Sequence, residues 1–261
     1  MTLRDPLPFG DIGRPVVAMA TDYPAGDHIP THRHTWAQLV YASEGVMTVS
    51  AEAGRWVVPP HRAVWMPAGL EHAITMHGPV RMRTLYVVPD AAPDLPAACR
   101  VVSVSPLLQA LILRAMEIRR DYDEKGPDGR IMRVILDELR ALPVAPLHLP
   151  RPADRRLTRV TEALLDDPAD QRTLEAWARV AGASPRTLAR LFVHETGLSF
   201  GAWRQRARLL RALVALAQDT PVTAVAFDLG YDSPSAFIAA FKRNFGTTPG
   251  RYFRTQGGDG H

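Results

Sequence analysis

The chain has 261 residues, of which 46% are hydrophobic and 22% are charged, and its formal net charge at pH 7 is +4. This length favours two domains over one, and a single cysteine excludes an internal disulfide framework and suits a reducing compartment. Because the sequence has no apolar N-terminal signal and no stretch approaches the roughly 18 apolar residues of a membrane span, it predicts a soluble, cytoplasmic protein with no membrane partner.

Short strands broken by glycine and proline are predicted over about the first 90 residues. Many short strands at close spacing are typical of a β-barrel or a sandwich. The turns at 43–45 and 52–54 contain glycine and fit hairpins between these strands. The predicted strands are Val16–Tyr23, Gln38–Ala42, Val46–Ala51, Arg55–Val58, Ala63–Met66, His72–Met76 and Arg81–Val88.

Four polar side chains of this region have the character of metal ligands. His32, His34 and Gln38 share the parity of an extended strand, so their side chains can point to one face, into a barrel. His72 follows the turn at 67–69 on a separate strand. Three imidazoles and an amide oxygen suit one divalent ion such as zinc, nickel, iron or manganese. The alternative is that the histidines line a ligand pocket or bond within the barrel.

The same spacing resembles the two motifs of the cupin family over about residues 15–90. The resemblance implies a small barrel that holds a metal ion. In cupins with catalytic metals a carboxylate usually occupies the position of Gln38, and the neutral amide is a poorer ligand. The matching motif residues are His32, His34, Gln38 and Gly45, followed by Pro67, Gly69 and His72, and the implied ligands are His32, His34, Gln38 and His72.

Aromatic and thioether side chains are frequent between the histidines. Each of them alone is explained by a barrel core, but a small barrel lined by several such groups can hold one small molecule. The sequence therefore predicts an apolar or aromatic effector. The predicted effector pocket consists of Trp36, Tyr41, Met47, Trp65 and Tyr86.

Between residues 103 and 142 the apolar period becomes helical. Leu107–Met116 and Ile131–Leu142 are predicted helices joined by a charged turn, and their apolar faces cover either the barrel or the same pair in a second subunit. The proline-rich segment 142–156 is predicted to be a linker. The predicted regions are a cupin-like barrel at 1–95, a helical connector at 96–150 and a DNA-binding domain at 151–261.

The C-terminal region contains one pattern twice, shifted by 49 residues. Each copy begins with Ser-Pro, continues with apolar residues at helical spacing, ends at a glycine and follows a shorter helix that glycine also closes. Two helices joined by such a turn form a helix-turn-helix unit, whose second helix fits the major groove. The predicted units lie near residues 174–195 and 222–245.

An amphipathic helix, Phe200–Ala217, separates the two units. Its 18 residues span roughly 27 Å, which would set the two reading helices about one duplex turn, or 34 Å, apart. Arg204, Arg208 and Arg211 are predicted to form a solvated basic side of this helix, and contact with the DNA backbone is the alternative. Residues 151–261 carry 16 basic and 11 acidic side chains, against 15 and 16 in residues 1–150, so the basic excess coincides with the helix-turn-helix units.

The segments GASPRTLARLFVHETG and DLGYDSPSAFIAAFKRNFGTTPGRYF resemble the DNA-binding domain of AraC/XylS-type transcriptional regulators over about residues 155–255. The resemblance implies sequence-specific binding to double-stranded promoter DNA, a homodimer, and RNA polymerase as a further partner. The predicted fold is α+β and multidomain, with a barrel that senses a small molecule or a metal. We assign no catalytic residue; the alternative function is a metal-dependent oxygenase or isomerase fused to a DNA-binding domain.

The first reading helix carries the long side chains that can read bases. Arg186 and Arg190 lie on one helix face, and each guanidinium can bond the O6/N7 pair of a guanine, while contact to phosphate alone is the alternative. The second reading helix has no long donor near its start and is predicted mainly to anchor phosphates. The predicted DNA-binding residues are Ser184, Arg186, Thr187, Arg190, Ser233, Ser235, Lys242 and Arg243.

Overall fold

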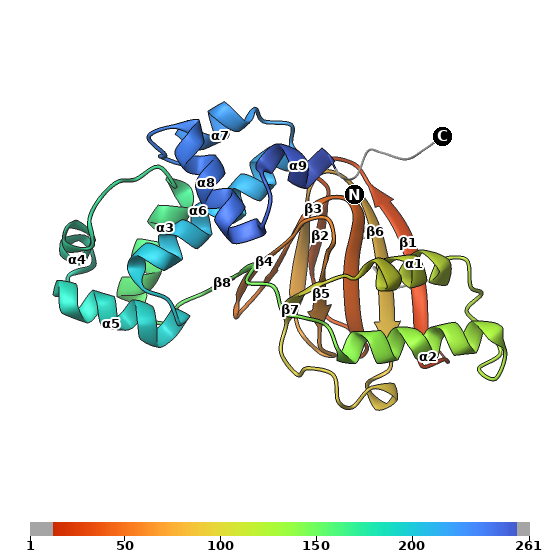
Figure 1. The fold of residues 1–261 in the computed structure, drawn as a ribbon. Helices are drawn as coiled ribbons and strands as arrows, with labels where there is room; N and C mark the ends of the chain where they lie inside the picture. The colour runs from red at the N-terminus through yellow and green to blue at the C-terminus, as the bar shows by residue number, and fades with distance from the viewer. Residues whose placement is uncertain (1–12, 255–261) are drawn as a thin grey trace. The chain divides into compact units, whose positions relative to one another are not determined.

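The computed structural model describes residues 13–254, which divide into two compact units (Figure 1). The sheet unit comprises residues up to 52 and residues 56–148, and the helical unit comprises residues 53–55 and the chain from 149 onward. Part of the N-terminal stretch in which no signal is predicted, residues 1–12, lies outside the described residues. None of the described helices is long and apolar enough to cross a membrane.

The sheet unit is built on one eight-stranded sheet. Its strand order, β1-β6-β3-β4-β8, has β2 paired with β6, β5 paired with β3, and β7 paired with β5. Because β1 and β8 lie at opposite ends of this order, the described strands form a cupin-like sheet that does not close into the predicted barrel. The strands are β1 (Val16–Tyr23), β2 (His28–His32), β3 (Ala37–Ala51), β4 (Gly54–Val58), β5 (Arg62–Met66), β6 (His72–Val87), β7 (Arg100–Ser103) and β8 (His148–Pro150).

Strands β3 and β6 are each continuous where the sequence predicts two strands. The predicted hairpin turn at 43–45 is wrong, because this segment of β3 contains register shifts and stays paired with β6. A bulge bends a strand without reversing it, and its glycine resembles a turn in the sequence. Gly45 has φ +83°, and a Cβ there would overlap the carbonyl oxygen of Pro79. Across the bend, Arg81 forms a 3.0 Å salt bridge with Glu44.

The predicted linker, residues 142–156, is hydrogen bonded over much of its length. It contains β8, and the backbone N–H of Val57 donates to the carbonyl of Leu147 (3.1 Å). Further along, the N–H of Ala153 donates to the carboxylate of Glu195 (2.8 Å). Backbone pairing needs no apolar periodicity, so a proline-rich sequence gives no indication of it. The linker is therefore largely an ordered segment.

Helices α1 (Pro106–Ala115) and α2 (Pro127–Arg140) pack on one face of the sheet (Figure 1). Their buried side chains form a single apolar core with the strands. The apolar faces of these helices were expected to cover either the barrel or the same helices of a second subunit. The side chains that are buried pack on the sheet. The core includes Val16, Leu39, Tyr41, Trp65 and Leu85 from the strands, and Leu108, Ile112, Ile135 and Leu139 from the helices.

The helical unit places two helix pairs, α4–α5 and α7–α8, around the central helix α6. The side chain of Ser184 accepts the N–H of Thr187 (3.1 Å), and that of Ser233 accepts the N–H of Ala236 (3.2 Å), so the repeated Ser-Pro motif caps two equivalent helices. The helices are α3 (Arg155–Asp166), α4 (Leu174–Ala181), α5 (Pro185–Thr196), α6 (Phe200–Ala217), α7 (Val222–Asp228), α8 (Pro234–Phe245) and α9 (Pro249–Arg254).

Helix α6 is buried over more of its circumference than an amphipathic pattern predicts. Leu209 and Ala212 are buried as well as the predicted apolar positions Trp203 and Leu213. The prediction of a solvated basic side is wrong for Arg208, which is only 8% exposed. A helix that is apolar on most sides belongs in a core, so α6 is the core of this unit as well as the spacer between its two pairs.

Candidate functional site

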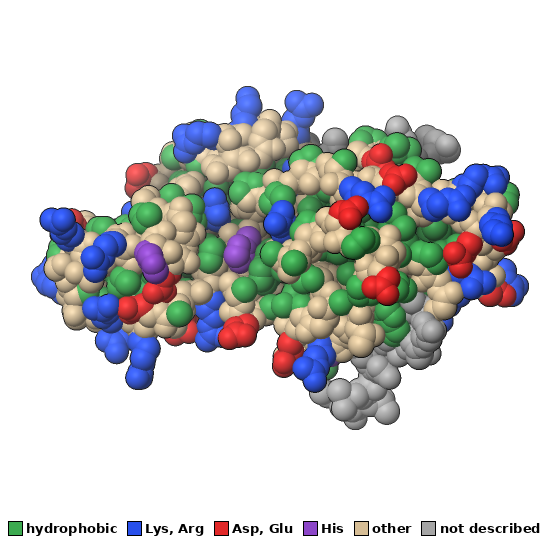
Figure 2. Space-filling view, turned by 90° about the horizontal axis from the view of Figure 1, so that it is seen from below, with side chains coloured by type: hydrophobic (Ala, Val, Ile, Leu, Met, Phe, Trp, Pro, Cys, Tyr) green, Lys and Arg blue, Asp and Glu red, His purple; other side chains and the backbone are tan. Residues whose placement is uncertain are grey.

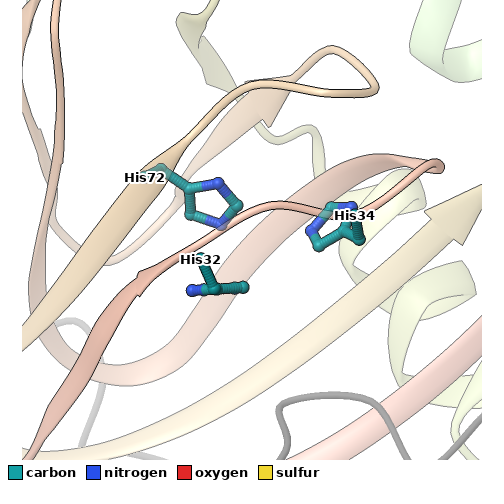
Figure 3. Close-up of side chains that lie close together, drawn as sticks. All are labelled: His32, His34 and His72. Atoms are coloured by element: carbon teal, nitrogen blue, oxygen red, sulfur yellow. The ribbon is translucent and has the colours of Figure 1, made fainter.

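Three histidines converge at one end of the sheet (Figure 3). His32 ends β2, His34 lies in the loop that follows, and His72 begins β6. The ring centroids of His32 and His72 are 4.3 Å apart, and those of His34 and His72 are 5.3 Å apart. One ring nitrogen of each residue lies within 4.8 Å of the others. The structure thus brings the three predicted ligands together.

The predicted strand parity of His32, His34 and Gln38 is not the reason for this convergence, because His32 ends β2, His34 lies in the loop and Gln38 belongs to β3. His32 lies directly opposite His72 in the β2–β6 register. After β2 the chain turns, and the N–H of Gly69 donates to the carbonyl of His34 (2.8 Å). Gly69 has φ +77°, a conformation that favours glycine. The second predicted motif thereby holds the loop of the first.

Backbone carbonyls fix the protonation of the three rings. The Nδ1 atoms of His32, His34 and His72 lie 2.9, 2.7 and 2.8 Å from the carbonyls of residues 30, 36 and 70. Since a carbonyl only accepts, each Nδ1 carries a proton, and a neutral ring in this tautomer has its lone pair on Nε2. Burial lowers the pKa of His72 to about 4 and also lowers that of His34, so both rings are held neutral. These partners are backbone carbonyls, which every residue carries, so the sequence did not predict them.

One of these lone pairs has no hydrogen-bond partner among the described residues, and another faces an acceptor. The Nε2 atom of His72 is buried without a hydrogen bond among the described residues. The Nε2 atom of His34 lies 3.0 Å from Oε1 of Gln38, while the Gln38 amide group donates to the Tyr86 hydroxyl (3.3 Å). Two acceptors at this distance repel each other unless a proton or a cation lies between them. If the Gln38 amide were reversed, its NH2 group would donate to Nε2 of His34 and the repulsion would disappear. Measuring bound metal distinguishes a cation between the two acceptors from a reversed amide.

The predicted effector pocket divides between the two faces of the sheet. Trp36 and Tyr86 lie beside the histidines, with ring centroids 6.3 and 5.8 Å from that of His34. Tyr41 and Trp65 belong to the core beneath α1 and α2. They alternate with Gln38 and its partners along β3 and β5, so strand parity directs them away from the histidines. Met47, the fifth predicted residue, is fully buried and lies opposite Met76 of β6.

Helix α5 exposes the predicted base readers. Arg186 and Arg190 are exposed, and their guanidinium groups form no hydrogen bond or ion pair with another described residue. Leu188 and Phe192 of the same helix are fully buried, which fixes the outward face. The hydroxyls of Ser184 and Thr187 lie 2.9 Å apart at the helix start, so they are engaged in capping before any ligand binds.

Helix α8 presents a different surface. Ser235 is exposed near its start, and Lys242 and Arg243 are exposed near its end. Ser233 caps the helix, and Phe237 and Phe241 are fully buried against the core. Cations of this helix are therefore confined to its C-terminal half, as the sequence predicts.

Basic side chains project from the part of the helical unit that contains α4 and α5 (Figure 2). Arg204, by contrast, donates to the carbonyl of Arg172 (3.1 Å), and Arg208 donates to the carbonyl of Pro168 (2.7 Å). An apolar period alone does not distinguish a solvated arginine from one that bonds carbonyls within the fold. Of the three predicted arginines of α6, Arg211 is the exposed one.

Two family models match the chain. One, described as an AraC-like ligand binding domain, matches residues 14–127, and the other, described as a helix-turn-helix domain, matches residues 177–255. The HTH-type transcriptional regulator NimR of Escherichia coli (strain K12) is 38% identical over 223 residues, which cover 85% of this chain and 81% of that protein.

Two further similar proteins match over a smaller share of their own length or of this chain. The HTH-type transcriptional regulator RipA of Corynebacterium diphtheriae is 36% identical over 222 residues, covering 84% of this chain and 61% of that protein. The solved C-terminal domain of AraT, a response regulator from Geobacillus stearothermophilus, is 28% identical, covers 41% of this chain and 94% of that chain, and gives a TM-score of 0.37.

Proposed function

The chain belongs to the AraC family of DNA-binding transcriptional regulators, with an N-terminal ligand-binding domain and a C-terminal double helix-turn-helix domain, and from this premise we propose how it binds its ligands. The sheet unit binds a divalent transition metal ion together with a small effector. The helical unit reads the operator with α5 and anchors it with α8. A regulator that acts on promoter DNA works in the cytoplasm of a bacterial cell.

The observation that supports the metal most strongly is the fixed tautomer of three converging imidazoles. In metal sites, a ligating histidine commonly donates its second ring N–H to a carbonyl or carboxylate, as His32, His34 and His72 do here. Nitrogens bound at about 2.1 Å to one ion lie at most about 4.2 Å apart, so the widest separation, within 4.8 Å, needs only small ring movements. Gln38 would supply the amide oxygen.

We propose that the ion has a structural or sensory role. Three imidazoles and an amide leave its positive charge uncompensated, and zinc, nickel, iron and manganese all accept nitrogen and oxygen ligands. Trp36 and Tyr86 lie beside His34 and would supply aromatic surface for an effector. A ligand changes DNA binding only to the extent that its affinity differs between the DNA-competent arrangement and the others.

Selection from random DNA duplexes with the full-length protein tests the function. We expect enrichment of one sequence in two parts, with the more specific part contacted by α5 and the less specific part by α8. A regulator that reads sequence binds its operator about 10³–10⁷-fold more tightly than other DNA at physiological salt. Recovery of sequences no different from the starting pool would contradict sequence-specific regulation.

Replacing Lys242 with alanine is expected to weaken binding to all DNA sequences to a similar degree. Its ammonium is exposed at the end of α8, where it can neutralise one phosphate. The plot of log K against log salt concentration has a negative slope, and loss of one such contact makes this slope less steep by about 0.9. Titrations at several salt concentrations measure this slope. Lys125, the only other lysine in the chain, lies in the sheet unit, so Lys125→Ala should leave the slope unchanged.

The protein is further proposed to form a homodimer through α1 and α2. Leu107 of α1 is 55% exposed and Val134 of α2 is 44% exposed, so each helix keeps apolar surface beyond the face that covers the sheet. Sedimentation velocity should find a dimer that Leu107→Glu together with Val134→Glu converts to a monomer. Val144→Glu is the control, since Val144 is 58% exposed but lies outside both helices. A doubly substituted protein that remains dimeric would exclude this surface.

The sheet unit is proposed to bind its effector without converting it. Among the described residues, the metal-binding cluster of histidine, cysteine and acidic residues consists of His32, His34 and His72, with no carboxylate. The position at which catalytic cupins usually carry a carboxylate holds Gln38. A compound that alters DNA binding should therefore be recovered chemically unchanged after incubation with metal-loaded protein. A metal-dependent product would instead establish the alternative, an oxygenase or isomerase.

A further inference from the structure

The loop between α3 and α4, residues 167–172, lies in the helical unit where the two helix-turn-helix units approach each other. It leads directly into the first helix of the first unit through Thr173, whose side chain accepts the N–H of Ala176 (3.3 Å). Arg172, at the end of the loop, places its guanidinium 3.7 Å from the ring centre of Trp177. The loop is thereby joined to the buried face of α4, because Trp177 is only 1% exposed.

Arginines of α6 bond the backbone of this loop. Arg208 donates from Nε to the carbonyl of Pro168 (2.7 Å) and from Nη2 to the carbonyl of Asp170 (3.1 Å). Arg204, one turn earlier, donates to the carbonyl of Arg172 (3.1 Å). A guanidinium presents several donors in a rigid planar fork and can bond two carbonyls at once, which a lysine ammonium does not reproduce. The loop is thus fixed to α6 along its length.

The same loop and the same helix also bond the turn of the second helix-turn-helix unit. Gln171 donates to the carbonyl of Gly230 (2.6 Å), which follows the C-cap residue Leu229 of α7. Gln205 of α6 donates to the hydroxyl of Tyr231 (2.9 Å), and the Arg208 guanidinium lies 5.8 Å from the centre of the Tyr231 ring. The three contacts converge on two adjacent residues of one turn.

The fit at this turn leaves no room for a larger residue. Gly230 has φ +71°, and a Cβ there would lie 2.7 Å from the carbonyl oxygen of Ala169 and 2.8 Å from Nε2 of Gln171. Backbone of the loop therefore packs directly on backbone of the turn. A displacement of either segment would break hydrogen bonds that Arg208 and Gln171 make to the other parts of the contact.

We propose that Arg208 is a positioning residue that sets the separation and orientation of the two helix-turn-helix units, and so determines which spacing between the two parts of the operator the protein accepts. The two parts must lie at a fixed distance for both reading helices to enter the groove together. The α6 helix supplies the length between the units. The contact centred on Arg208 supplies the angle between them.

Affinity for three DNA duplexes tests the proposal with the full-length protein and its selected operator. The duplexes are the operator, the operator with its second part scrambled, and the operator with one to three base pairs inserted between the parts. Arg208→Met keeps much of the apolar stem and removes the donors. We expect it to bind the intact operator at least tenfold more weakly, to bind the scrambled operator within twofold of the wild type, and to lose the wild-type preference for the original spacing.

Three further variants make the test specific. Arg211→Met removes an exposed arginine from the same helix and should change none of the affinities. Arg208→Lys should restore part of the spacing preference through a single donor contact. Gln171→Leu alters an exposed side chain outside the core and should relax the spacing preference in the same direction, even if Arg208→Met fails to fold. Unchanged spacing preference in Arg208→Met and Gln171→Leu, or equal losses on intact and scrambled operators, would overturn the proposal.

Discussion

Replacing Arg190 with alanine is expected to weaken binding of the full-length protein to its operator by about 1–3 kcal/mol and to relax the preference at one base pair. Arg190 is exposed on α5, four residues after Arg186, and has no ion-pair partner among the described residues that would compete with DNA. Leu188 and Phe192 hold the opposite helix face in the core, so the guanidinium points outward. A bidentate bond to guanine explains both expected effects.

Competition binding with operators substituted at each base pair measures the affinity and the base preference of the Arg190→Ala protein. Arg179→Ala is the matched control, because Arg179 is an exposed arginine of the same helix-turn-helix unit but lies on α4. The control should retain both affinity and specificity. If Arg190→Ala lowered the affinity for every DNA sequence by one factor, Arg190 would be a phosphate contact, and base reading by α5 would rest on Arg186.

Purified wild-type protein, prepared without chelator, is expected to retain about one divalent metal ion per chain, and His32→Ala is expected to retain none. His32 is partly exposed, so its removal leaves no large buried cavity. Loss of an outer-sphere partner alone typically costs about 10–100-fold in metal affinity, and loss of a direct ligand should cost more. The two remaining imidazoles, His34 and His72, would then hold the ion too weakly to survive purification.

Elemental analysis of the purified proteins, with thermal unfolding before and after chelation, provides the measurement. His28→Ala is the control, because His28 is exposed on the same strand, β2, but bonds Thr75 and does not join the cluster. It should keep the metal. Wild-type protein that contains no metal when kept free of chelator would contradict the site and favour the reversed Gln38 amide, which satisfies His34 with a hydrogen bond.

Local patterns predicted the DNA-binding region because its determinants are themselves local. The Ser-Pro motifs at 184 and 233 specify a cap and a first turn, and apolar residues at positions such as Leu188 and Phe237 specify the buried face. The family predicted from these segments is confirmed, as is the combination of a cupin-like sheet domain with a helical double helix-turn-helix domain.

Features that depend on distant contacts were not predictable in the same way. The bulge at Gly45 looks like a turn until its packing against Pro79 is known. Tyr41 and Trp65 have the composition of pocket residues, but strand register directs them beneath α1 and α2. The sequence pattern places Arg208 on a solvated basic side of α6. In the structure its guanidinium donates to carbonyls of a loop that lies 38 to 40 residues earlier in the chain.

The candidate metal site depends partly on local sequence patterns and partly on distant contacts. The two cupin-like motifs identify His32, His34 and His72 by spacing alone, although these residues come from two strands and a loop. Their tautomers depend on backbone carbonyls and on the turn at Gly69, which no side-chain pattern encodes. The close approach of Gln38 to His34 likewise emerges only in three dimensions.

One chain is proposed to present two groove-fitting helices at a separation matched to the pitch of DNA. Hydroxyl-radical and methylation-interference footprinting of the full-length protein on its selected operator test it most directly. We expect two contacted major-groove segments on one face of the duplex, with centres about 10 base pairs apart. A single contacted segment for each chain, or two segments on opposite faces of the duplex, would contradict it.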